Sequence, residues 1–103
     1  MTETDLRELS RKEIAEHLGL LPGWTFENDK ISKEFKFASF REGIDFLKKL
    51  AIFCDRIDHH PDIHIYYTKI LFELQRVSVG GKVTSLDFVV AREIERLYNL
   101  FNV

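Results

Sequence analysis

The chain has 103 residues, of which 45% are hydrophobic and 31% are charged. That balance predicts a single compact domain over residues 1–103 and excludes a disordered chain. Fifteen Lys and Arg against seventeen Asp and Glu give a formal charge of −2, a poor electrostatic match for nucleic acid or an anionic membrane. The polar amino-terminal segment and the lack of a long apolar run lead us to expect a cytoplasmic protein.

The first third of the chain has the pattern of a helix followed by a β-hairpin. Ser10 and Glu13 have the spacing of a capping box, and apolar residues then recur at helical intervals until Pro22-Gly23 ends them. From Trp24 to Phe37 the pattern changes to two short β-like runs. Asn28-Asp29, which lies between them, is typical of a hairpin turn.

A longer helix is predicted next, with Ser39 as its cap and an end before Pro61, because proline disfavours helical backbone in the residue ahead of it. Its apolar stripe is wide, which suggests burial on more than one side. The single cysteine, Cys54, lies in this stripe and is interpreted as a small core side chain and not as a nucleophile.

Two β-rich segments follow, from Ile63 to Tyr67 and from Ile70 to Val79. Tyr66 and Tyr67 in adjacent strand positions would place an aromatic ring on each face of the sheet. Gly80-Gly81 then closes the second segment as a turn.

The last helix is predicted from Thr84 and Asp87, a second pair with capping-box spacing. The element order is therefore α-β-β-α-β-β-α. It predicts an α+β fold in which a four-stranded antiparallel sheet carries its helices on one face. The unpaired edges of such a sheet predict self-association.

The densest chemistry is a cluster of acidic and histidine residues within ten positions: Asp55, Asp58, His59, His60 and His64. Imidazoles beside carboxylates suit acid/base catalysis near neutral pH. A structural alternative stays open, because histidines also end helices favourably and Pro61 is an ordinary stop signal. A metal site ranks last, because the HExxH spacing is missing.

The segment Asp55-Arg56-Ile57-Asp58-His59-His60-Pro61-Asp62-Ile63, followed by Tyr67, closely resembles the signature of the pterin-4a-carbinolamine dehydratase family. The resemblance extends over nearly the whole chain. It includes Leu21-Pro22-Gly23-Trp24, Ile31 to Phe37, Phe40 to Phe46, Gly80-Gly81, Thr84 and Asp87.

The resemblance implies the same α+β fold and the dehydration of 4a-hydroxytetrahydropterin to quinonoid dihydropterin. In the family this reaction recycles tetrahydrobiopterin for aromatic amino acid hydroxylases, and it needs no metal or bound cofactor. Family members form dimers or tetramers, so a homodimer or homotetramer that acts on a reduced pterin is expected.

Carried over residue by residue, the resemblance makes His59 a general acid/base and His60 a catalytic residue that holds the pterin. It makes Asp55 a group that orients or charge-tunes an imidazole or forms a hydrogen bond with the pterin ring. It implies a substrate-binding role for five further residues: Asp58, Pro61, Tyr67, Asp87 and Trp24. Three of these residues could instead have purely structural roles. Asp87 could serve only as a helix cap, and Tyr67 and Trp24 could serve mainly in packing.

The chain departs from the family pattern at Val77, where the family normally has a third histidine. Valine can neither donate nor accept a proton, so activity could be weakened. The alternative function is therefore a weak or inactive family member that acts as a protein-binding, regulatory or assembly module.

Overall fold

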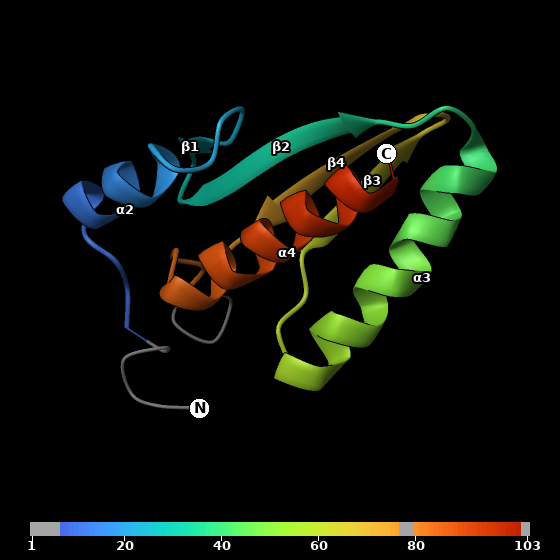
Figure 1. The fold of residues 1–103 in the computed structure, drawn as a ribbon. Coiled ribbons are helices and arrows are strands. Elements are labelled where there is room, and N and C mark those ends of the chain that lie inside the picture. Colours follow the sequence, from blue (N-terminus) through green and yellow to red (C-terminus); the bar gives the residue numbers. More distant parts are fainter. Residues whose placement is uncertain (1–6, 77–79, 102–103) are drawn as a thin grey trace.

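The computed structural model of the protein describes residues 7–76 and 80–101. Within these ranges, three helices alternate with two β-hairpins in the predicted α-β-β-α-β-β-α order (Figure 1). The elements are α2 (Arg11–Leu18), β1 (Thr25–Glu27), β2 (Lys30–Lys36), α3 (Phe40–Ile57), β3 (Asp62–Tyr66), β4 (Lys69–Leu74) and α4 (Ser85–Phe101).

The predicted serine caps begin the first two of these helices. Ser10 forms a complete capping box: its Oγ accepts from the Glu13 amide at 3.1 Å, and Glu13 Oε1 accepts from the Ser10 amide at 2.9 Å. Ser39 Oγ accepts from the Glu42 amide at 3.1 Å. Each cap satisfies a backbone N–H that the helix itself leaves without a partner.

The strands pair in the order β1-β2-β4-β3, and every pairing is antiparallel. Asn28 and Asp29 form the β1–β2 turn with φ of 54° and 60°, the left-handed backbone that a tight hairpin requires. The antiparallel four-stranded sheet with helices on one face is thus confirmed.

One expectation about the strands is wrong. Tyr67 is not a strand residue, because the register pairs Tyr66 with Lys69 and leaves Tyr67 and Thr68 to make the turn. Tyr67 has a φ of 55° and its side chain is 78% exposed. The two tyrosines therefore do not place a ring on each face of the sheet.

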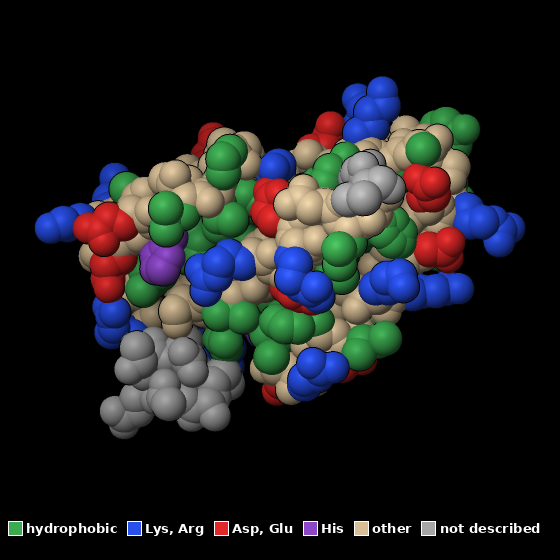
Figure 2. Space-filling view, viewed as in Figure 1, with side chains coloured by type: hydrophobic (Ala, Val, Ile, Leu, Met, Phe, Trp, Pro, Cys, Tyr) green, Lys and Arg blue, Asp and Glu red, His purple; other side chains and the backbone are tan. Residues whose placement is uncertain are grey.

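The core lies between the sheet and the helices α3 and α4 (Figure 1). Ile31, Phe35 and Phe72 project from β2 and β4 into this layer and are at most 2% exposed. The helices contribute fully or almost fully buried side chains: Phe46 and Leu50 from α3, and Phe88, Val90 and Ile94 from α4. Basic and apolar side chains share the outer helical surface (Figure 2).

The edge strand β3 is covered less well than its neighbours. Ile63 and Ile65 pair with Phe72 and Ile70, so they point to the helical face, yet they are 40% and 41% exposed. No helix within residues 7–76 and 80–101 is long and apolar enough to span a membrane.

Candidate functional site

The end of α3 determines where the two adjacent histidines point. Asp58 takes left-handed backbone, with φ of 54° and ψ of 47°, directly after the last helical residue. The amide of His59 then donates to the carbonyl of Cys54 at 3.1 Å, which closes a Schellman-type helix end. The chain leaves the helix at this turn, so His59 and His60 lie beyond α3 and not on it.

His59 points inward and meets Asp87 on the first turn of α4. Its Nε2 lies 2.5 Å from Asp87 Oδ1, and the two side chains are 7% and 0% exposed. A buried carboxylate beside Nε2 fixes the orientation of the imidazole and favours the tautomer with its proton on Nε2.

The same carboxylate also caps α4. Asp87 Oδ2 accepts from the backbone amide of Thr84 at 2.7 Å, and the Asp87 amide donates to the Thr84 carbonyl at 3.1 Å. The two interpretations of Asp87 from the sequence, a helix cap and a site residue, are therefore compatible, because each uses a different oxygen.

His60, unlike His59, is half exposed. Its Nε2 lies 2.8 Å from Asp55 Oδ1, and the side chains of His60 and Asp55 are 52% and 77% exposed. Asp55 lies in the last turn of α3 and His60 lies beyond the helix end, so this contact joins the helix to the segment that follows it.

His60 also lines a pocket of about 120 Å³ between α3 and β3. The other lining residues are mostly apolar: Leu47, Leu50, Ala51, Cys54, Pro61 and Ile63. Burial, and then the charges of Asp55 and Glu93, raises the pKa of the Cys54 thiol to about 11. Cys54 is therefore a protonated thiol at neutral pH, in agreement with its interpretation as a core side chain.

Trp24 belongs to a different contact set. Its Nε1 donates to Glu95 Oε1 at 2.9 Å, and Lys33 Nζ donates to the same oxygen at 2.6 Å. Glu95 is eight positions beyond Asp87, which is about 12 Å along the axis of α4. These contacts anchor Trp24 to α4 and do not bring it to His59.

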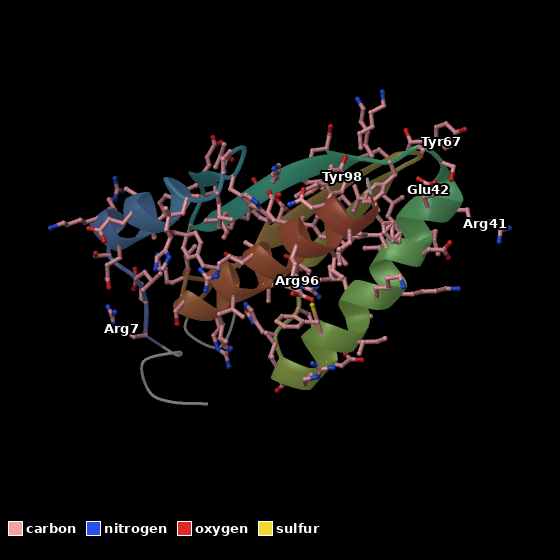
Figure 3. The ribbon with its side chains drawn as sticks, viewed as in Figure 1. Arg7, Arg41, Glu42, Tyr67, Arg96 and Tyr98 are labelled. Atoms are coloured by element: carbon pink, nitrogen blue, oxygen red, sulfur yellow. The ribbon has the colours of Figure 1, made fainter. Side chains whose placement is uncertain are left out.

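Tyr67 lies at the opposite end of α3 from the histidines. The turn that holds it is bound to the chain just before α3, where the Phe37 amide donates to the Thr68 carbonyl at 2.8 Å. Figure 3 shows Tyr67 near Arg41 and Glu42 in the first turn of that helix. An 18-residue helix is about 27 Å long, so Tyr67 does not reach His59 within one chain.

The substrate-binding role of Asp58 and the substitution at Val77 are two further predictions that concern the site. Asp58 has its clear role in the helix end described above, and its substrate-binding role stays a prediction. Val77, the residue at the position of the third family histidine, lies outside the described residues.

A charged cluster that was not predicted from the sequence lies on the open face of the sheet. Glu73 joins His64, whose Nε2 is 2.8 Å from its Oε1, to Lys30, whose Nζ is 3.1 Å from its Oε2. Only the strand register brings these three residues together, so their positions along the chain do not predict the cluster. Among the described residues, no group of three or more His, Cys, Asp or Glu could hold a metal ion.

The fold is that of a small α+β protein that contains a buried histidine–carboxylate pair. A family model described as pterin 4 alpha carbinolamine dehydratase matches residues 7–97. The chain belongs to this family.

Curated relatives match most of the chain. A protein of Sulfolobus acidocaldarius is 41% identical over 90 residues, which cover 87% of this chain and 98% of the relative. One of Prochlorococcus marinus is 34% identical over 91 residues, which cover 88% and 94%. Their names assign both, provisionally, to the pterin-4-alpha-carbinolamine dehydratases.

Solved structures share the fold. A crystal structure of a transcriptional coactivator/pterin dehydratase from Brucella melitensis matches with a TM-score of 0.83 at 29% identity, over 88% of this chain and 98% of that one. A pterin dehydratase-like protein identified as a RuBisCO assembly factor matches with a TM-score of 0.57 at 21% identity, over 72% and 84%.

Proposed function

We propose that the chain dehydrates a 4a-hydroxytetrahydropterin to the quinonoid dihydropterin, with His59 as the general acid/base. The observation that carries this proposal is the buried contact between His59 Nε2 and Asp87 Oδ1. A histidine held by a buried carboxylate is a common arrangement for proton transfer. Family membership supplies the substrate class.

The reaction removes water and forms one double bond. The bond between C4a and its hydroxyl oxygen breaks as that oxygen gains a proton, and N5 loses its proton as the C4a–N5 double bond forms. One imidazole can perform both transfers: the imidazolium donates a proton to the leaving oxygen, and the neutral imidazole that results accepts the N5 proton and becomes imidazolium again. No net proton is consumed.

Because Asp87 contacts one ring nitrogen of His59, the two ring nitrogens have different roles. Nε2 is held by the carboxylate, so proton exchange with the substrate falls to Nδ1. The carboxylate also stabilises the imidazolium that forms after proton uptake. His60 stands at the exposed end of the site, where Asp55 orients its ring to bind the pterin.

Val77 limits this mechanism to one side of the pterin. In the family, the first and third histidines act as acids for the two C4a stereoisomers, and this chain keeps only the first. We therefore expect one stereoisomer to react normally and the other to react about 100-fold to 10,000-fold more slowly, the usual contribution of a positioned acid.

The test is the dehydration of synthetic 4a-hydroxytetrahydropterin, as mixed stereoisomers, followed by stopped-flow absorbance. We expect a fast and a slow phase, and His59→Ala should abolish the fast one. His64→Ala is the matched control, because His64 lies on β3 against Glu73, outside the proposed site. Dehydration no faster than in buffer, or a fast phase that survives His59→Ala, would refute the proposal.

A binding or assembly role is the second candidate. Val77 favours it, and so does the likeness in fold to the RuBisCO assembly factor. Failure of the dehydration assay with a correctly folded protein would favour this candidate over the first.

A further inference from the structure

The segment before α2 is joined to the start of α4, next to the proposed site. The Leu9 amide donates to the Val83 carbonyl at 2.9 Å, and Glu8 and Thr84 form an isolated antiparallel bridge. Leu9 is 5% exposed and Thr84 is fully buried. Thr84 is the residue whose amide binds Asp87 Oδ2, so this attachment is one hydrogen bond away from the site carboxylate.

A second contact comes from α2 itself. The ring of His17 stacks on the ring of Phe88, with centroids 4.5 Å apart and planes inclined by 19°. Phe88 is fully buried and directly follows Asp87 in the chain. The residues at both ends of the Asp87 turn, Thr84 and Phe88, are thus held by the same amino-terminal segment.

This segment, residues 7–18, is also held together by hydrogen bonds between its own residues, and we call it the brace. Arg7 binds Glu13 with two hydrogen bonds of 2.8 and 3.0 Å, and the capping box joins Glu13 to Ser10. In Figure 1 the brace runs beside the amino-terminal half of α4.

We propose that the brace positions Asp87 against His59, and that His17 is a positioning residue acting through Phe88. The inference rests on the proposed function. Asp87 reaches Thr84 with one oxygen and His59 with the other, so a small rotation of the first turn of α4 moves Oδ1 relative to Nε2. Stacking on Phe88 resists that rotation. His17 has no role in the proposed chemistry itself.

The alternative is that His17 only packs against the core. The two explanations predict different behaviour for variants that keep or remove the flat ring. His17→Phe keeps the stack without a titratable group, His17→Leu keeps apolar volume without a ring, and His17→Ala removes both. Glu16→Ala is the matched control, because Glu16 is the exposed neighbour on the same helix.

Two readouts are measured on the full chain. The first is kcat and KM for dehydration. We expect kcat to fall about 10-fold to 100-fold in His17→Ala, as for a misplaced catalytic group, with KM changed by less than about twofold. His17→Phe should restore kcat, His17→Leu should not, and Glu16→Ala should match the parent.

The second readout does not depend on activity. The proton and nitrogen NMR signals of the His59 ring report whether Nε2 carries the proton shared with Asp87. That Nε2–H signal should shift or broaden in His17→Ala and His17→Leu and return in His17→Phe. An inactive parent protein would refute the proposed function, whereas the NMR comparison would still decide the role of the brace.

The inference is overturned if His17→Ala and His17→Leu lower the melting temperature but leave kcat and the His59 ring signals as in the parent. It is also overturned if His17→Phe fails to restore them. Should His17→Ala not fold, His17→Leu against His17→Phe makes the same comparison.

Discussion

Asp87 shows how one buried side chain can serve the fold and the site together. Oδ2 accepts from the Thr84 amide and begins α4, while Oδ1 lies 2.5 Å from His59 Nε2. Truncation to alanine would remove both interactions and would leave the Thr84 amide and the imidazole without this partner. A substitution that keeps one interaction and changes the other is more informative.

Asp87→Asn is that substitution. An amide has one carbonyl oxygen, which can still accept from Thr84, and its NH₂ group then faces His59 and favours the wrong imidazole tautomer. We expect kcat to fall about 100-fold or more. The free energy of unfolding should change by less than about 1 kcal/mol, the usual contribution of a cap, because the bond from Thr84 is kept. Steady-state kinetics and urea denaturation measure the two effects. Normal kcat in a stable Asp87→Asn protein would mean that His59 does not depend on the carboxylate.

Asp58 is one of the non-glycine residues with left-handed backbone, and it ends α3. Its φ of 54° is left-handed, a conformation that glycine adopts without steric cost. We expect Asp58→Gly to stabilise the protein by about 0.5–1 kcal/mol and Asp58→Ala to destabilise it by a similar amount. Denaturation midpoints of the two variants give the comparison. Destabilisation by glycine would show that the Asp58 carboxylate contributes more than the strain costs.

At the scale of elements, α2 depends on an acidic residue with a strongly altered titration. The hydrogen bond from Arg7, followed by that from the Ser10 amide, lowers the pKa of Glu13 from 4.5 to about 2. A carboxyl group whose pKa is depressed by folding contributes stability above its unfolded pKa. That contribution is lost as the pH falls from about 4.5 through about 2.

In the folded protein Glu13 should therefore take up its proton, and release Arg7, only near pH 2, below the range in which ordinary carboxyl groups titrate. We expect the urea midpoint to fall between pH 4.5 and pH 2, and Glu13→Gln to flatten part of this fall because glutamine does not titrate. Glu16→Gln on the same helix is the control. Parallel pH profiles for the parent and Glu13→Gln would contradict a role for Glu13 in acid stability.

For the molecule as a whole, local signals in the sequence were enough to predict the elements and their order. Capping spacings located the starts of the helices, and Asn28-Asp29 located a hairpin. The end of β3 was predicted one residue too late, at Tyr67, because β-branched and aromatic residues continue through it, and only the strand register shows where β3 ends. Likewise, His59 and Asp87 are 28 positions apart, so their contact depends on how α4 packs near the end of α3.

The last prediction concerns association between copies of the chain. Among the described strands, β3 is an edge strand that pairs with β4 alone, and its Ile63, Ile65 and Tyr66 are 40%, 41% and 58% exposed. An edge strand with exposed apolar side chains is a surface on which another chain can pair. Light scattering at micromolar concentration should therefore give a mass well above the 12.2 kDa of one chain.

Ile65→Lys tests whether β3 forms that contact, because a charge on an edge strand opposes pairing. We expect this variant to scatter as a smaller species while it keeps its circular dichroism spectrum. Leu20→Lys is the matched control, since Leu20 is 81% exposed in the segment after α2, away from β3, and should leave the mass unchanged. A parent protein of 12.2 kDa would contradict self-association, whereas an unaltered mass in Ile65→Lys would place the contact on another surface, such as the exposed Ile52 side of α3.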